Sequence, residues 1–283
     1  MLRFMRLAIV GIVAALAGCV VVPERQHALV LDTHGTVAQL SMRCGEPDAA
    51  LSGRDGSLDP SGIRLASWNV HKENDSGWEA DLGRLAGEAD ILLLQEAGVS
   101  TEFRTVVEQA GFSWLLAGAF EYLGAEYGVL TATRVQPVQA CTLRAYEPLL
   151  GIPKAALITQ YRLAGRDDTL AVANLHAINF TLDVDAYRAQ LDAIAGALAA
   201  HRGPMIVAGD FNAWNSARDA AVRGLAATLS LEPAVFAIDA RTRFMGDHIF
   251  DRVYARGVEF VATAAQSVTS SDHNPLLVSF RVY

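Results

Sequence analysis

The sequence is poor in cysteine and in positive charge, and it has no internal repeat. Its 283 residues include only three cysteines, which form no cluster, so a thiolate-bound zinc site is disfavoured. The formal net charge of −8 gives no global positive field that would attract nucleic acid or anionic lipid, although a bound divalent cation can reverse the sign locally. The absence of a fixed period argues against a repeat architecture. The composition, 52% hydrophobic and 19% charged, is instead typical of a globular protein with a full core.

The first residues have the pattern of an export signal. MLRFMR carries two arginines and no acid, and LAIVGIVAALAG is an uninterrupted apolar run that is too short to span a bilayer comfortably. The run leads into Leu-Ala-Gly-Cys, which resembles the lipobox of bacterial lipoproteins, in which the cysteine carries the lipid. We therefore expect a signal peptide over residues 1–18 and lipidation at Cys19. An ordinary signal peptide cut nearby, or an uncleaved anchor, is the alternative.

This N-terminus predicts a place in the bacterial cell envelope, anchored by lipid and facing the periplasm. Val20 follows the cysteine where an inner-membrane lipoprotein would carry Asp, which favours the outer membrane over the inner one. With Cys19 used for the lipid, Cys44 and Cys141 remain as an even pair in an oxidising compartment. We expect a disulfide between them, and two free buried thiols are the alternative.

Beyond the signal, composition and periodicity divide the chain into two parts. Residues 19–60 are mixed and contain LSGRDGSLDPSG, a stretch rich in turn-forming residues, so we expect a tether there and a single domain over residues 61–283. Periodic or capped segments predict helices at 79–88, 99–111 and 184–200. Apolar runs predict strands at 63–70, 89–96, 127–134, 154–163, 169–176, 205–210, 250–257, 258–265 and 275–282. This order predicts helices on the outside of packed sheets.

Polar residues end or follow several of the predicted strands. Each has an ordinary explanation when taken singly, because Asp and Asn form turns and helix caps, and a histidine in an apolar strand is commonly a satisfied core residue. Together they are too many for that explanation, and strand ends can converge at one edge of a pair of sheets. The residues are Asn69, Glu96, Asn174, His176, Asp210, Asn212, Asp251, Asp272 and His273.

The types of these side chains indicate metal-assisted hydrolysis of a phosphate ester. Carboxylate and amide oxygens favour a hard cation, which we expect to be Mg²⁺, with Mn²⁺ or Ca²⁺ as alternatives. An imidazole held by an acid can stabilise developing negative charge, and asparagine can donate a hydrogen bond to a phosphoryl oxygen. These groups are the components of metal-dependent phosphoryl chemistry.

The order of seven motifs resembles the endonuclease/exonuclease/phosphatase superfamily. SWNV, LLLQEA, YGVLTATR, NLHAIN, GDFNAWN, FDRVYARG and SDHNPLLVSF occur in the family's order across residues 63–283. The resemblance implies a DNase I-like α+β fold, a four-layer α/β/β/α sandwich in which two packed mixed β-sheets are flanked by helices. It also implies a divalent metal between the sheet edges.

The resemblance further implies a role for each motif residue. In this scheme Asp210 orients or deprotonates the attacking water, and His273, held by Asp251, stabilises the pentacovalent transition state. The expected metal ligands are Asn69, Glu96 and Asp272. The expected catalytic residues are His176, Asp210, Asn212, Asp251 and His273, and the expected substrate-binding residues are Lys154, Asn174 and Asn212.

Two departures from the family pattern bear on the substrate. Lys154 stands where many relatives have arginine, and a lysine lacks the bidentate fork for phosphate. His176 stands where relatives of the abasic-site endonuclease type tend to carry Asn, which argues against DNA repair. Substrate choice is assigned to the expected loops 112–126 and 233–248.

These observations favour a metal-dependent phosphodiesterase of nuclease type, acting on DNA or RNA. Three alternatives stay open. One is sphingomyelinase-like or phospholipase C-like hydrolysis of a phospholipid, the second is phosphomonoesterase activity, and the third is a non-catalytic envelope binding module on the same fold. The sequence gives no evidence of a protein partner.

Overall fold

The computed structural model describes residues 20–24, 27–31, 37–40, 43–44, 51, 56–181, 183–244 and 246–283. The signal peptide predicted over residues 1–18 and the lipidation site Cys19 lie outside these ranges, so both stay predictions. Within the described ranges, no helix is long enough and apolar enough to cross a membrane.

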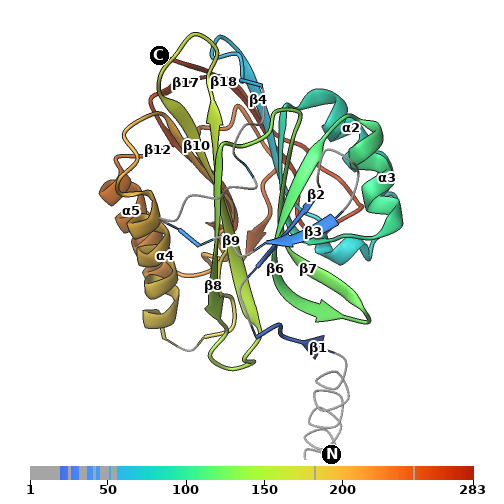
Figure 1. Cartoon of the computed structure of the whole chain (residues 1–283). Coiled ribbons are helices and arrows are strands. Elements are labelled where there is room, and N and C mark those ends of the chain that lie inside the picture. Colours follow the sequence, from blue (N-terminus) through green and yellow to red (C-terminus); the bar gives the residue numbers. More distant parts are fainter. Residues whose placement is uncertain are drawn as a thin grey trace, which may run out of the picture.

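Two β-sheets pack face to face at the centre of the molecule (Figure 1). The larger sheet has the order β13 (Ile238–Asp239), β17 (Val258–Ala265), β18 (Leu276–Val282), β4 (Ile63–Asn69), β5 (Ile91–Gly98), β7 (Ala125–Thr133), β6 (Ser113–Tyr122), β2 (Ala28–Leu31) and β3 (Val37–Leu40), with β1 (Val20–Val21) paired to β6. The smaller sheet has the order β12 (Glu232–Pro233), β16 (Asp251–Arg256), β11 (Met205–Asp210), β10 (Thr169–His176), β9 (Pro153–Arg162) and β8 (Gln139–Tyr146). A separate hairpin joins β14 (Arg243–Phe244) to β15 (His248–Ile249).

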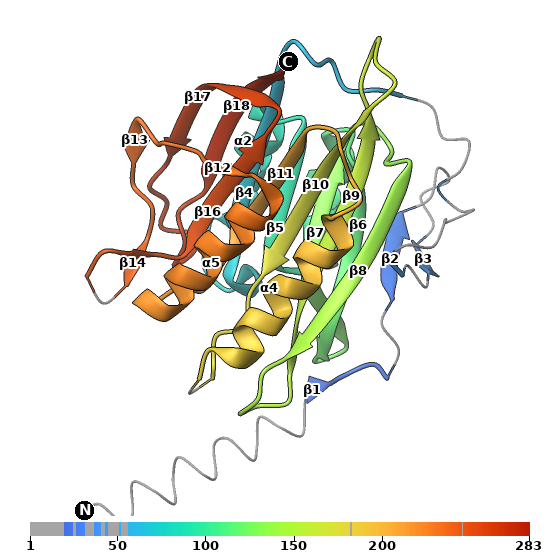
Figure 2. The same cartoon turned by 90° about the vertical axis from the view of Figure 1, so that its left-hand side faces the viewer.

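Helices cover the outer face of each sheet (Figure 2). The helices α2 (Trp78–Glu88) and α3 (Thr101–Gln109) bury their apolar residues against the larger sheet. The helices α4 (Asp185–Leu198) and α5 (Ser216–Leu229) do the same on the smaller sheet. The predicted four-layer sandwich is therefore confirmed.

The inner faces of the strands are apolar along most of their length and polar at one end. In β4 the residues Ile63 and Leu65 face the other sheet, and two more steps of the same alternation lead to Asn69. In β11 the residues Ile206 and Ala208 lead in the same way to Asp210. The apolar core between the sheets thus ends in a polar layer at one edge of the sandwich.

All nine predicted strands and all three predicted helices are present, with bounds that agree to within two residues. Three of the longer elements were not predicted, namely β6, β8 and α5, and neither were the strands of two to four residues. The expected loop over residues 112–126 is wrong, because most of it forms β6 and the beginning of β7.

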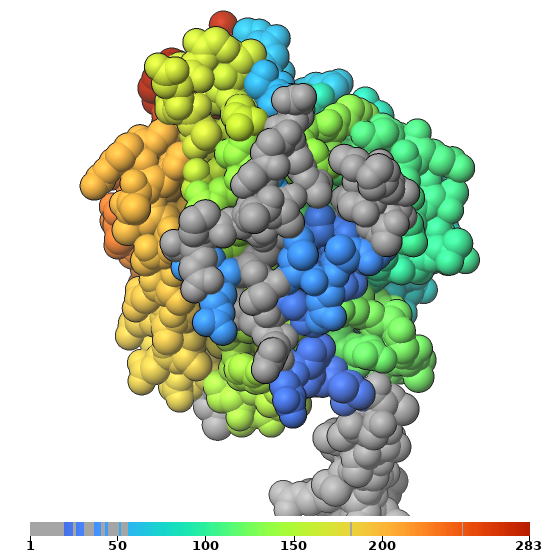
Figure 3. Space-filling view, viewed as in Figure 1, coloured from blue at the N-terminus to red at the C-terminus, as the bar shows by residue number. Residues whose placement is uncertain are grey.

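The tether predicted over residues 19–60 is wrong for those parts of it that the structure describes. β1 and β2 both pair with β6, and β2 continues the sheet to β3. Ala28 and Val30 are buried against β6, and His27 Nε2 lies 2.6 Å from Glu126 Oε1. The segment covers the edge of β6 that would otherwise lie open, and Figure 3 shows its blue residues beside the green ones. Strands of two and four residues give too short a pattern to recognise in the sequence.

A disulfide ties this segment to the smaller sheet. Cys44 and Cys141 are joined, with a Cα–Cα distance of 4.8 Å. Cys141 lies in β8, and the two cysteines are 97 residues apart in the sequence. The bond therefore closes a long loop, which contains β4 to β7.

Replacement of both cysteines by serine is expected to lower the free energy of unfolding by about 2–4 kcal/mol, because the bond restricts the unfolded chain. Urea denaturation under oxidising conditions measures the change. Reductant should lower the urea midpoint of the wild type and leave that of the double variant unchanged. Equal midpoints for the two proteins without reductant would contradict the prediction.

Candidate active site

Three of the predicted catalytic residues share one rung of the smaller sheet. β10 and β11 are parallel, with His176 opposite Asp210. β11 and β16 are antiparallel, with Asp210 opposite Asp251. Residues in register on neighbouring strands point to the same face, so all three side chains point toward the larger sheet, and all three are buried.

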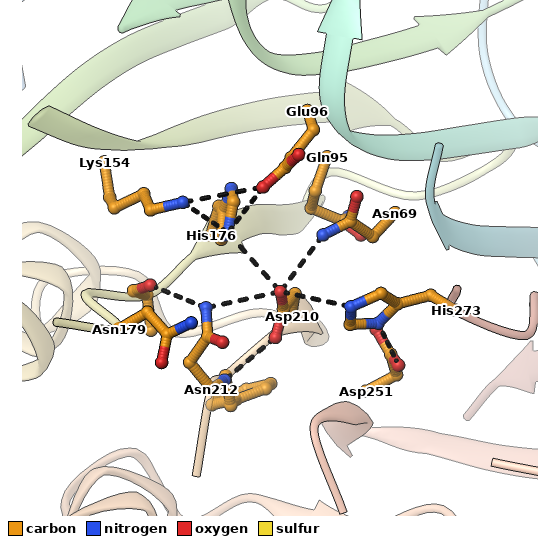
Figure 4. Close-up of polar contacts among 12 residues, drawn as sticks. Asn69, Gln95, Glu96, Lys154, His176, Asn179, Asp210, Asn212, Asp251 and His273 are labelled. Carbon is orange, nitrogen blue, oxygen red and sulfur yellow. Dashed lines mark hydrogen bonds and ion pairs between the residues drawn. The ribbon is translucent and has the colours of Figure 1, made fainter. Parts of the chain in front are cut away.

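The carboxylate of Asp210 lies at the centre of the site (Figure 4). Asn69 Nδ2, from the larger sheet, donates to Asp210 Oδ2 at 3.1 Å, and the backbone N–H of Asn212 donates to Oδ1 at 2.9 Å. His176 Nε2 and His273 Nε2 lie 3.4 and 3.9 Å from the same Oδ2 atom. Asp210 thus brings together residues from both sheets and from the segment before β18.

His273 is held by Asp251 and carries a positive charge. Its Nδ1 lies 2.7 Å from Asp251 Oδ2, and its backbone carbonyl accepts a hydrogen bond from Trp68 Nε1 at 2.9 Å. Burial alone would lower the pKa of His273, but the carboxylates of Asp251, Asp210 and Asp272 outweigh it and raise the pKa to about 10. The imidazole is therefore protonated at neutral pH.

His176 has the opposite charge state. Lys154 Nζ lies 2.9 Å from His176 Nε2. Burial and the nearby Lys154 ammonium lower the pKa of His176 to about 3, against the opposing effect of the Asp210 and Glu96 carboxylates. Asp210 therefore has a charged imidazole on one side and a neutral one on the other at pH 7.

Glu96 reaches the site because the strand that carries it has a bulge. The pairing of β5 with β7 shifts between Gln95 and Ala97, and Glu96 has a left-handed φ of 52°. Simple alternation from Leu93 and Gln95, which face the other sheet, would turn Glu96 toward the helices. The bulge instead turns its carboxylate into the site, where it lies 3.6 Å from Lys154 Nζ (Figure 4).

The Glu96 carboxylate is ionised. Burial would raise its pKa, but the positive charges of His176 when protonated, of Lys154 and of Lys72 lower the pKa to about 2. Lys72 Nζ also donates a hydrogen bond to Glu96 Oε2. Lys72 lies in a short turn, His71–Glu73, which is separated from the end of β4 by Val70 alone.

These residues line a cavity of about 350 Å³ that can be compared with the needs of a metal. Glu96 and Asn69 place a carboxylate and an amide on its wall, and this set of oxygen donors suits a hard divalent cation. A second group, Asp210, Asp251 and His273, offers ligand atoms within 4.8 Å of one another among the described residues. In this second group His273 Nδ1 and Asp251 Oδ2 already pair with each other at 2.7 Å, so the oxygen donors of the first set suit a hard cation better.

Two predicted site residues lie outside this centre. Asp272 lines the cavity at its mouth with a side chain that is 62% exposed, and its Oδ1 lies 3.9 Å from His71 Nδ1. Its role as a metal ligand stays a prediction. Asn174 is not in the cavity, so its assignment to substrate binding is wrong. It faces the same way as His176 but lies two residues further into the core. There its Oδ1 accepts a hydrogen bond from Gln95 Nε2, and its Nδ2 donates one to the carbonyl of Leu130.

Arg218 is a buried arginine that the sequence did not reveal. It holds the backbone behind the site through hydrogen bonds. Arg218, in α5, donates to the backbone carbonyls of Ile178 and Asn179 at 2.7 Å each and to that of Asn212 at 2.9 Å. Its guanidinium also stacks on the ring of Trp214 at 4.6 Å. Because its partners are backbone atoms, no residue pattern in the sequence points to it.

Glu147 is a second residue that the sequence did not reveal. It is 1% exposed, in the connection between β8 and β9, and its two carboxylate oxygens accept the backbone N–H groups of Asn179 and Phe180 at 2.7 Å each. One buried carboxylate thus fastens two loops of the cavity rim to each other.

The sequence model of the Endonuclease/Exonuclease/phosphatase family matches residues 66–273. The chain belongs to this family. The matched stretch begins in β4 and ends at His273, so it contains all the residues around Asp210, and the predicted membership is confirmed. Members of this family are hydrolases that act on phosphate esters.

Curated relatives and solved structures agree with this membership. A UPF0294 protein of Vibrio parahaemolyticus is 36% identical over 259 residues, which cover 92% of this chain and 90% of the relative. A UPF0294 protein of Yersinia pseudotuberculosis is 39% identical over 223 residues, covering 77% of this chain and 84% of the relative.

The catalytic domain of human Nocturnin, with a bound sulfate anion, has a TM-score of 0.59 at 20% identity and covers 82% of this chain and 99% of its own. ANGEL2, a 2′,3′-cyclic phosphatase, has a TM-score of 0.60 at 13% identity, covering 81% of this chain and 98% of its own. The structural likenesses show a shared fold.

Asp251→Asn is expected to move the alkaline limb of the pH–activity profile to lower pH. The Asp251 carboxylate stabilises the charged form of His273, so its removal lowers the pKa of His273 from about 10 and the imidazolium is lost earlier as pH rises. Profiles of kcat/KM between pH 6 and about 10 measure the shift. Asp239→Asn, a carboxylate that pairs with Arg241, is the matched control and should leave the profile in place. An unchanged alkaline limb in Asp251→Asn would refute the assignment of that limb to His273.

Arg218→Met is expected to lower the free energy of unfolding by about 3 kcal/mol, because three buried hydrogen bonds from its guanidinium to backbone carbonyls are lost. It should also lower kcat, because Asn212 and the loop at Asn179 lose their brace. Urea denaturation and steady-state kinetics measure both effects. Arg188→Met, on the exposed side of α4, is the control, and equal losses in the two variants would show that the brace has no special role.

Proposed function

We propose that the protein is a metal-dependent phosphodiesterase of the bacterial cell envelope, held there by an N-terminal lipid. The observation that carries the catalytic part is the position of the Asp210 carboxylate between one charged and one neutral imidazole. The export pattern of the first 18 residues and the Cys44–Cys141 disulfide support the envelope location.

Each residue around the phosphate has a separate role in hydrolysis. Asp210 accepts a proton from the attacking water, whose oxygen forms the new bond to phosphorus. His273, which carries the positive charge, donates to the phosphoryl oxygen on which negative charge develops. Asn212 and His176 hold the phosphate from the other side. The bond from phosphorus to the leaving oxygen breaks, and the proton that Asp210 took is given up to the departing alcohol.

A divalent cation is part of this proposal. Glu96 and Asn69 are the residues that would hold it, and Mg²⁺ is proposed, with Mn²⁺ or Ca²⁺ as alternatives. When bound, the cation supplies Lewis-acid polarisation of the phosphoryl group. Lys154, beside Glu96, contributes a fixed positive charge to the same side of the cavity.

A diester is favoured over a monoester because a fold neighbour, ANGEL2, is a 2′,3′-cyclic phosphatase, and such a cyclic phosphate is itself a diester. The phosphomonoesterase is the second candidate. A non-catalytic binding module is disfavoured, because binding alone requires neither the Asp251–His273 pair nor two imidazoles in opposite charge states.

The first test measures hydrolysis of bis(p-nitrophenyl) phosphate, p-nitrophenyl phosphate and plasmid DNA by the full-length protein, with Mg²⁺ and with EDTA. We expect diester cleavage that EDTA abolishes and that His273→Ala lowers by about 10²–10³-fold. His201→Ala, an imidazole in the connection from α4 to β11, is the matched control and should retain activity. Cleavage of the monoester alone would establish the phosphatase, and no cleavage in any arm would support the binding module.

Metal binding can be measured without turnover. Glu96→Gln removes a charged oxygen donor and should weaken Mn²⁺ binding by about tenfold or more in titration calorimetry. Glu102→Gln changes an exposed carboxylate on α3 and should leave the affinity unaltered. If both variants bind Mn²⁺ as tightly as the wild type does, the metal is not held by Glu96.

A further inference from the structure

Exposed apolar side chains gather at one end of the molecule. Among the described residues, eleven large apolar side chains are exposed, and six of them belong to β1, the β6–β7 turn, the end of β8 with the loop to β9, and the loop after β10. These elements lie at the end of the sandwich that carries the cavity. The six side chains are Val21 (56% exposed), Leu123 (73%), Tyr146 (52%), Leu149 (60%), Leu150 (50%) and Phe180 (52%). We call these six residues the apolar rim. None of them is charged.

The apolar rim adjoins the place where the chain enters the fold. Val20 pairs with Tyr122 in the last position of β6, next to Leu123 at the turn into β7. β1, the β6–β7 turn and the β8–β9 turn lie together at the lower end in Figure 1 and Figure 2. Figure 3 shows the blue residues of β1 beside the yellow-green residues of the β8–β9 turn. In the sequence, the apolar run LAIVGIVAALAG ends only two residues before Val20.

The rim is a built surface with fixed backbone positions. Glu147 fastens the loop of Leu149 and Leu150 to the loop of Phe180 through two hydrogen bonds of 2.7 Å. Arg218 holds the second of these loops through the carbonyl of Asn179. Leu149, Leu150 and Phe180 are therefore presented by a backbone that hydrogen bonds hold in place, and their burial in another phase costs little conformational entropy.

The rim continues into the cavity. Leu150 and Phe180 belong both to the exposed surface and to the cavity wall. From them an apolar wall of Phe120, Val129, Ile152 and Pro153 leads to the polar residues around Asp210. A phosphate that lies at Asp210 therefore has room beside it for an apolar substituent.

We propose that the apolar rim docks on a lipid bilayer and that the substrate is a phosphodiester of a membrane lipid, drawn from that bilayer with its hydrocarbon part along the apolar wall. The inference rests on the proposed function, since it names the substrate class of the same site. The side chains of the rim enter the bilayer interface. Removing their apolar surface from water there contributes favourable free energy to binding. Hydrolysis consumes one water and gives an alcohol and a phosphomonoester, one of which keeps the hydrocarbon part.

The rim favours a lipid over a nucleic acid as the source of the phosphodiester. A nucleic-acid surface carries lysines and arginines for the phosphates and aromatic rings for the bases. Four of the six rim residues are aliphatic and cannot stack on a base, and the chain has a net charge of −8. Nuclease activity is therefore an outcome of the test and not part of the proposal.

The test compares a bilayer substrate with soluble ones. The full-length protein is reconstituted into vesicles of phosphatidylethanolamine and phosphatidylglycerol, and the phosphate esters formed are followed by ³¹P NMR. The same preparation is assayed on bis(p-nitrophenyl) phosphate and on plasmid DNA. The rim variant is Leu123→Ser with Leu149→Ser, two exposed residues that do not line the cavity. The matched control is Ile238→Ser with Val261→Ser, which are 66% and 57% exposed on β13 and β17, at the opposite end in Figure 2.

We expect turnover of vesicle lipid that the rim variant loses by about tenfold, because two large apolar contacts with the bilayer are removed. Its activity on the soluble diester should stay within about twofold of the wild type, and the control variant should match the wild type on both substrates. As a measurement independent of activity, vesicles should protect backbone amides of residues 120–125 and 146–151 from hydrogen exchange in the wild type.

The outcomes separate this inference from the proposed function. Cleavage of the soluble diester or of DNA without turnover of lipid would overturn the inference and leave the phosphodiesterase standing. Equal lipid turnover by wild type and rim variant, or absence of protection on vesicles, would also overturn it. Loss of all diester cleavage in the wild type would remove the proposed function, and the inference with it.

Discussion

The pairing of β10 with β11 in one register is the constraint on which the site depends. Each strand has a period of two, so a slip of one residue would turn Asp210 to the outer face, away from His176 and Asp251. Gly209 makes this pairing possible. It has a φ of +136°, and a Cβ atom there would lie 2.1 Å from the carbonyl oxygen of Leu175. The Asp210 carboxylate is thus preceded by the one residue type that allows its strand to lie so close to the neighbour.

The charged neighbours of the two buried imidazoles explain why the imidazoles differ in charge. Both histidines lose hydration, which alone would leave both neutral. His273 has Asp251 at 2.7 Å as a partner, and His176 has the ammonium of Lys154 at 2.9 Å. Each neighbour acts strongly because little water screens it at the end of the apolar core. The chemical difference between two residues of one type is therefore set by which strand supplies the neighbour.

Much of the sandwich and most of the site could be predicted from the sequence, because both follow from strand alternation and from polar residues at strand ends. Alternation gives the face of a side chain but not its depth, which is why Asn174 was misplaced. The bulge that turns Glu96 into the cavity leaves no mark in LLLQEA, and only the family resemblance indicated its role. Arg218 and Glu147 bind backbone atoms of segments that are distant in the sequence. No pattern of side chains in the sequence therefore predicts their roles.

The bond between Cys44 and Cys141 determines how the molecule carries mechanical load. Tension applied along the chain from its two ends runs from Val20 to Cys44, crosses the bond into β8 and continues to the C-terminus. The 97-residue separation spanned by the bond encloses Asn69 and Glu96, and this stretch is bypassed. Along the covalent chain, a pull on the N-terminal end therefore passes through Cys141 into the smaller sheet, and the strands that present the oxygen donors lie outside this covalent path.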